Sequence, residues 1–130
     1  MMNIFNQFRK AKVSNGLASL DDIKLPEVSL VWPESWWYLE NESNEAKLRI
    51  SIQKELNSEV GPKHPLWGYK PVVFAKSEKS DDVLVYLNDG RFAVVRLVWH
   101  GHIDQVPDKF PKTVFFEDKD DLQRFLKEEM

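Results

Sequence analysis

One dipeptide constrains the fold of this chain more than any other feature: Asp89-Gly90, which lies between two runs of β-branched and aromatic residues at 83–87 and 92–99. Glycine and aspartate tolerate positive φ, so this arrangement is typical of a tight β-hairpin. A two-residue loop would fix the register of the two strands. The predicted pairs are Leu87 with Phe92, Val85 with Val94, and Val83 with Arg96.

This register predicts apolar side chains on both faces of the hairpin. One face would carry Val83, Val85, Leu87, Phe92, Val94, Arg96 and Val98. The other would carry Leu84, Tyr86, Ala93, Val95, Leu97 and Trp99. A sheet with one solvent-exposed face would instead alternate apolar and polar residues along each strand. The hairpin is therefore predicted to lie at the centre of a sheet, with a covering layer on each side.

The rest of the chain supplies further strands and two helices. Residues 72–75 and 113–116 are strand-like, and residues 118–128 form a predicted terminal helix. A longer helix is predicted over 41–60, with Ser43 as its N-cap. We predict an α+β fold with an antiparallel sheet of about four strands, both helices on one face and an aromatic N-terminal arm on the other. The expected organisation is one domain over 1–130, with an arm or short helices at 1–31 and a compact core at 32–130.

Composition narrows the classes of function. The chain has 130 residues, no cysteine and a formal net charge of -3. Disulfides, thiolate zinc sites and cysteine nucleophiles are excluded, and the acidic balance argues against a nucleic-acid partner. No stretch reaches the ~18 consecutive apolar residues of a membrane helix, and residues 1–12 lack the order of a secretory signal. A cytoplasmic protein without a membrane partner is expected, and its oligomeric state stays open.

A resemblance covers residues 63–116, less than half of the chain. His-Pro-Leu-Trp-Gly at 64–68, Asp81-Asp82-Val83-Leu84, Asp89-Gly90 and the strand that ends at Trp99 resemble a group of small bacterial proteins with no assigned activity. Trp67, Arg96 and Val98 depart from that group's Tyr, His and Thr, so any chemistry of its His-x-Thr pair does not transfer. Some small proteins of this general sort act as immunity proteins against bacterial toxins, and the resemblance implies that role as an expectation.

His100, His102 and Asp104 form the sharpest candidate for chemistry. Alternate residues of an extended segment point the same way, so two imidazoles and a carboxylate would converge on one divalent metal such as zinc. The spacing matches the start of the His-x-His-x-Asp-His pattern of metallohydrolases, but Gln105 replaces the last histidine. The competing interpretation is a polar loop that leaves a buried strand, with Gly101 at a bend. No cofactor is predicted under that interpretation.

Four aromatic residues lie within seven positions: Trp32, Trp36, Trp37 and Tyr38. Because both faces of the hairpin are apolar, each needs a covering layer, so most of this cluster is predicted to be buried as such a lid. Trp36 and Trp37 are adjacent and would point apart in an extended segment, which leaves one of them exposed. The candidate surface for a protein partner consists of Trp36, Trp37, Tyr38, Glu40 and Glu42.

A few charged and polar residues have two competing interpretations each. Arg96 would form an ion pair with a carboxylate such as Glu55 or Glu117, or line a pocket together with His64 and Trp67. Asp81, Asp82 and Asp89 look like paired carboxylates for acid–base chemistry, but aspartates at strand turns usually bond their own backbone.

The leading expectation for function is a non-enzymatic protein-binding module, in its specific form an immunity or antitoxin-like protein that occludes a basic toxin. Two alternatives stay open. One is a small metal-dependent hydrolase that uses His100, His102 and Asp104. The other is a structural subunit of a larger assembly, which the sequence does not separate from the first.

Overall fold

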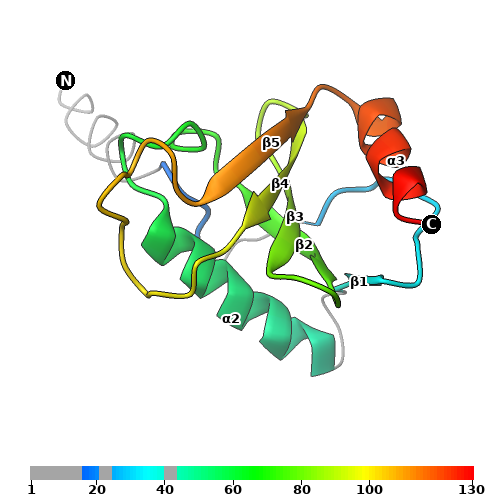
Figure 1. Cartoon of the computed structure of the whole chain (residues 1–130), viewed down its shortest axis with the longest axis horizontal. Coiled ribbons are helices and arrows are strands. Elements are labelled where there is room, and N and C mark those ends of the chain that lie inside the picture. The colour runs from blue at the N-terminus through cyan, green and yellow to red at the C-terminus, as the bar shows by residue number, and fades with distance from the viewer. Residues whose placement is uncertain (1–15, 21–24, 40–43) are drawn as a thin grey trace, which may run out of the picture.

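A computed structural model describes residues 16–20, 25–39 and 44–130, and shows one five-stranded antiparallel sheet with two helices (Figure 1). The elements in chain order are β1 (Trp36–Tyr38), α2 (Asn44–Glu59), β2 (Val72–Ser77), β3 (Asp82–Tyr86), β4 (Phe92–Arg96), β5 (Lys112–Phe116) and α3 (Lys119–Glu128). Neighbouring strands in the sheet follow chain order from β1 to β5. The α+β prediction is confirmed. The fifth strand is β1, which lies inside the predicted aromatic arm.

The hairpin of β3 and β4 is central, as predicted, but its register is shifted by one residue. The pairs include Leu84 with Val94 and Val85 with Ala93. The loop has three residues, because the Leu87 N–H donates to the Arg91 carbonyl at 2.9 Å and Gly90 takes a φ of 90°. A one-residue slip moves every side chain of one strand to the other face. Ala93, Val95 and Leu97 therefore share a face with Val83 and Val85.

The two helices cover opposite faces of the sheet, so their predicted placement on one face was wrong. Ile52 and Leu56 of α2 pack with the β3 residues Val83 and Val85 in an aliphatic core. Leu122 of α3 packs with Phe74, Phe92 and Phe116 in an aromatic core on the other face. In Figure 1, α2 runs along the lower side of the molecule and α3 lies at the upper right. An amphipathic pattern identifies the buried side of a helix but not the sheet face that it covers.

The arm before β1 shares the second face with α3, which confirms the predicted aromatic lid. Trp32 and Tyr38 pack on the aromatic core, and Trp36 is buried. Gln123 of α3 holds the arm through both ends of its amide: its Oε1 accepts from the Val31 N–H at 2.8 Å, and its Nε2 donates to the Val31 carbonyl at 2.9 Å.

A buried glutamine fixes α2 to the start of β2. Gln53 Nε2 donates to the Pro71 carbonyl at 2.9 Å, and its Oε1 accepts from the Val73 N–H at 2.8 Å. The predicted N-cap of this helix, Ser43, lies outside the described residues. At α3 the N-cap is Asp118, whose side chain accepts from the Asp121 N–H at 3.0 Å. Neither α2 nor α3 is long and apolar enough to span a membrane.

Candidate functional site

The segment that follows β4 carries an unusual set of exposed apolar side chains. This segment, residues 98–106, is called the Trp99 loop below. Trp99 is 43% exposed, and Ile103 and Val106 are also exposed. Figure 1 shows the connection between β4 and β5 at the left of the molecule, beside the C-terminal end of α2. Three exposed large apolar side chains in one short loop are a feature that often marks an interaction site.

A buried carboxylate at the end of α2 holds the backbone of this loop. Glu59 is 2% exposed. Its two oxygens accept from the N–H groups of Val98 and Trp99 at 2.8 and 2.7 Å. One turn earlier on the helix, Glu55 accepts from the Gly101 N–H at 2.9 Å. Since glutamates four residues apart lie on the same side of a helix, α2 binds three amides of the loop with two side chains.

The backbone of Trp99 is strained where Glu59 binds it. Its φ is +63°, a conformation that costs a bulky L-residue roughly 1–2 kcal/mol. Only one other non-glycine residue in the described ranges, Lys70, has a positive φ. The two hydrogen bonds to Glu59 offset that cost. The result is an indole that points outward from a fixed backbone.

Burial gives Glu59 a perturbed titration. Burial and a hydrogen bond with Glu55 raise the pKa of Glu59 to about 7, although the Val98 and Trp99 amides act in the opposite direction. A carboxyl group with such a pKa exchanges its proton near neutral pH. The protonated form retains one good acceptor oxygen, so it holds the two amides less firmly than the carboxylate does.

The Trp99 loop also packs closely on the turn that ends α2. A Cβ atom at Gly61 would lie 2.7 Å from Cδ1 of Ile103. Beyond that turn, the buried His64 fixes the start of β5. The Leu66 N–H donates to Nδ1 at 3.0 Å, so Nε2 carries the proton and donates to the Pro111 carbonyl at 2.7 Å. Burial lowers the pKa of His64, which favours this neutral form.

The predicted metal ligands lie in the Trp99 loop, where the two imidazoles stack on each other and His102 and Asp104 contact the backbone. His100 and His102 stack with ring centroids 5.5 Å apart. His102 Nδ1 lies 2.9 Å from the Ile103 carbonyl oxygen, and Asp104 accepts from the Val106 N–H at 2.9 Å. In the part of the chain that the structure describes, no three His, Cys, Asp or Glu side chains are grouped so that they could hold a metal ion.

The predicted aromatic surface at β1 is divided between core and solvent. Trp36 is buried, and its indole N–H donates to Glu129 at 2.7 Å. Trp37 is 46% exposed, which confirms that one of the adjacent pair points outward. Tyr38 is half-buried and packs against Phe74. Glu40 and Glu42, the acidic part of this candidate surface, lie outside the described residues.

The candidate pocket of Arg96, His64 and Trp67 does not form. His64 is buried beneath the start of β5, and Trp67 packs on the aliphatic core, where a Cβ at Gly16 would clash with its ring. Arg96 is exposed at the end of β4 and pairs with Asp82 across the hairpin, at 2.8 and 3.0 Å. The shifted register produces this pair, so the ion pair was correctly expected but its partner was not.

The aspartates at the strand turns have different roles. Asp89 accepts from the Arg91 N–H at 3.1 Å, as expected of a turn residue. Asp82 was expected to act in the same way, but it is the first residue of β3 and holds Arg96. Burial acts to raise the pKa of Asp82, but the hydrogen bonds and charge of Arg96 outweigh it and keep that pKa below its ordinary value.

Sequence reasoning missed the three groups that define this site. Trp99 was assigned to the buried face of a long strand, whereas β4 ends at Arg96. Glu59 was given no role, and Glu55 was considered only as a possible partner of Arg96. One signal was available: the predicted helix places two glutamates four residues apart close to its end, and Gly101 marks a bend in the loop.

No family model, curated protein or solved structure matches this chain.

Proposed function

We propose that this chain is a protein-binding module and that the Trp99 loop is its docking surface. One observation supports this proposal above all: an exposed tryptophan at a strained backbone position is held in place by a buried carboxylate. Burying Glu59 and straining Trp99 both cost free energy. Neither feature improves the hydrophobic core, so the arrangement is better explained by what it presents to solvent.

The chemistry of the loop suits a protein partner. Tryptophan is enriched among the side chains that dominate interface energies, especially when apolar neighbours surround it. Ile103 and Val106 of the same loop are also exposed. A backbone that is already fixed loses little conformational freedom on binding, so less of the interaction energy is spent on ordering the loop.

The net charge of -3 favours a partner with a basic surface, because complementary charge accelerates encounter and disfavours other partners. The resemblance to small bacterial proteins favours a specific form of the proposal. In that form the chain is an immunity protein that covers the working surface of a basic toxin. The mechanism is occlusion, with Trp99 as the anchor.

The test uses two tryptophans of nearly equal exposure. Tagged wild-type protein, Trp99→Ser and Trp37→Ser are each used to capture partners from cells of the protein's own source. The captured partner is then purified and its affinity for each variant is measured by calorimetry. We expect Trp99→Ser to weaken binding by about thirtyfold or more, and Trp37→Ser to leave it unchanged.

Two results would count against the proposal. Loss of binding in Trp37→Ser alone would assign the docking surface to β1. Failure of the wild-type protein to retain any partner would argue against a protein-binding role. Thermal unfolding of both variants shows whether they are folded, which we expect because both indoles are exposed.

A further inference from the structure

A second candidate site lies far from the Trp99 loop, where the C-terminus meets β1. A cavity of about 630 Å³ opens there between the arm, the β2–β3 turn and the end of α3. We call it the Ser35 cavity. Figure 1 places β1 and the C-terminus at the right, whereas the β4–β5 connection lies at the left. The volume falls within the range of small-molecule sites in proteins.

A buried hydroxyl lines this cavity. Ser35 is 8% exposed, and its Oγ makes no hydrogen bond with any residue that the structure describes. Its backbone is well fixed, since the Ser35 carbonyl accepts from the Glu78 N–H at 2.7 Å. A buried hydroxyl that bonds to nothing destabilises a fold, so such groups usually have a functional explanation.

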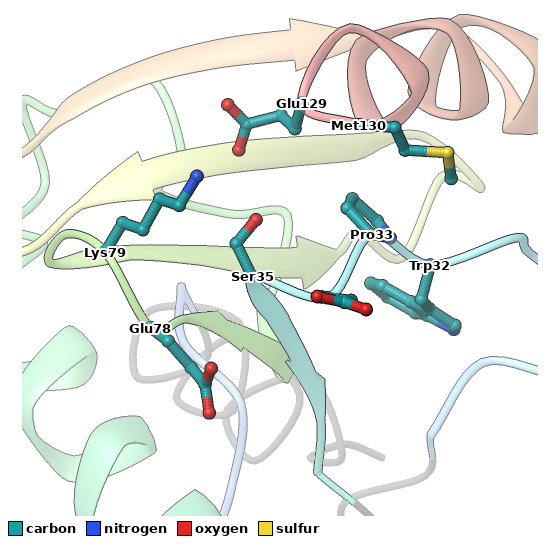
Figure 2. Close-up of a pocket in the computed structure, with 8 residues that line it drawn as sticks. Trp32, Pro33, Ser35, Glu78, Lys79, Glu129 and Met130 are labelled. Atoms are coloured by element: carbon teal, nitrogen blue, oxygen red, sulfur yellow. The ribbon is translucent and has the colours of Figure 1, made fainter.

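Two opposite charges face this hydroxyl. Figure 2 shows the Lys79 ammonium and the Glu129 carboxylate pointing toward Ser35, while Glu78 points away. Among the described residues, Lys79 and Glu129 form no ion pair with each other within 4.0 Å. Glu129 is anchored, because its Oε1 accepts from the Trp36 indole at 2.7 Å. Its Oε2 has no such partner in the described part of the chain.

The rest of the lining combines the carboxylates of Glu34 and Glu78 with an apolar wall. Trp32, Pro33 and Met130 lie on the side opposite Lys79 in Figure 2. Trp32 is held by Tyr38 and Phe74, with ring centroids 5.9 and 6.3 Å away. The wall therefore offers a fixed aromatic surface beside the polar groups.

We propose that the Ser35 cavity binds a small zwitterion of the amino-acid class with an apolar side chain. The ligand's carboxylate would pair with Lys79 and its ammonium group with Glu129. The Ser35 hydroxyl, which lies between Lys79 and Glu129, would hydrogen-bond the charged end of the ligand. The ligand's apolar side chain would lie against Trp32. This site is separate from the docking surface of the Trp99 loop, and neither proposal depends on the other.

Phenylalanine serves as the probe, with two analogues as controls. Phenethylamine lacks the carboxylate, and 3-phenylpropanoate lacks the ammonium group. We expect calorimetry to detect saturable binding of phenylalanine with a Kd tighter than about 1 mM. Each analogue should bind about tenfold to a hundredfold more weakly, because each leaves one charge of the cavity without its partner.

Variants of the lining residues test the assignment. Lys79→Met and Glu129→Gln should each weaken phenylalanine binding by a similar factor. Lys63→Met and Glu128→Gln alter equally exposed charges outside the cavity and should not affect it. Trp99→Ser should bind phenylalanine as the wild type does.

Ser35→Ala gives the sharpest readout. Because the hydroxyl bonds to none of the described residues, its removal should leave the thermal midpoint of the free protein unchanged or raised, while phenylalanine affinity falls. A purely structural serine would show the opposite pattern. The proposal is overturned if phenylalanine does not bind at millimolar concentration, or if binding survives all three substitutions in the cavity.

Discussion

Two exposed tryptophans of this protein reach the surface for different reasons. Trp37 is 46% exposed and Trp99 is 43% exposed, so solvent accessibility alone does not distinguish them. Trp37 lies in β1, where successive side chains alternate between the two faces. Its neighbour Trp36 is buried, and the exposure of Trp37 follows from that fact. Trp99 lies in a loop whose backbone is held by Glu59 at a positive φ.

The difference shows what exposure costs in each region. At β1, the exposure of Trp37 requires only the alternation of side chains along a strand. At the Trp99 loop, the observed conformation requires a buried carboxylate and a strained residue, both of which destabilise the fold unless they are compensated. A feature that costs free energy and faces solvent is a stronger indication of a binding role than an apolar side chain that is merely exposed.

The largest expected effect separates the two neighbours in β1. Trp36→Ala should lower the free energy of unfolding by about 3–5 kcal/mol, because it empties part of the aromatic core and removes the bond to Glu129. Trp37→Ala should change it by no more than about 0.5 kcal/mol. Urea denaturation of both variants checks this. Equal effects would show that β1 does not divide the pair between core and solvent.

A pH dependence should mark the Trp99 loop. In the folded protein Glu59 keeps its proton up to a pKa of about 7, whereas an unfolded chain loses it near 4.5. The unfolded state therefore binds fewer protons between these values, and stability should fall as pH rises from 4.5 to 7. The full shift corresponds to about 3 kcal/mol.

Denaturation of wild-type protein and Glu59→Gln across that range measures this contribution. The substitution should remove most of the decline, because glutamine does not titrate. Glu117→Gln, at an exposed position, should retain it. If Glu59→Gln shows the wild-type slope, the buried carboxylate is not the source of the pH dependence.

The smallest expected effect differs in sign between the two regions. Trp99→Gly removes the strain of a positive φ but makes the unfolded chain more flexible. The first effect equals or exceeds the second, so the free energy of unfolding should be unchanged or higher by up to about 1 kcal/mol. Trp37→Gly places glycine in a strand and should cost about 0.5–1 kcal/mol. Thermal unfolding of the two variants gives the comparison, and destabilisation by Trp99→Gly equal to that of Trp37→Gly would contradict it.

The sequence predicted the elements of this fold better than their arrangement. The hairpin and both helices could be predicted from turn residues and apolar spacing. The register could not, because Asn88 extends the loop by one residue and the Asp89-Gly90 signal fits both loop lengths. The side of the sheet covered by α3 depends on contacts between segments far apart in the chain, such as Val31 with Gln123.

The candidate site was harder to predict for a related reason. A run of apolar residues up to Trp99 is typical of a strand, and nothing within that run marks its end at Arg96. The strand ends because Glu59, about 40 positions earlier, binds the Val98 and Trp99 amides. A second buried charge of α2 was also missed. Arg49 is 5% exposed, its Nε and Nη1 have no hydrogen-bond partner among residues 16–20, 25–39 and 44–130, and burial lowers its pKa.

The central claim, that Glu59 holds Trp99 in its exposed position, can be tested by amide hydrogen exchange. We expect the Val98 and Trp99 amides to exchange slowly in the wild-type protein and much faster in Glu59→Gln. The Leu97 amide, which donates to the Asp81 carbonyl at 3.1 Å, should stay protected in both. If the Val98 and Trp99 amides of the wild type exchange as fast as those of an unstructured peptide, Trp99 is not held by α2. The proposed docking surface would then lose its basis.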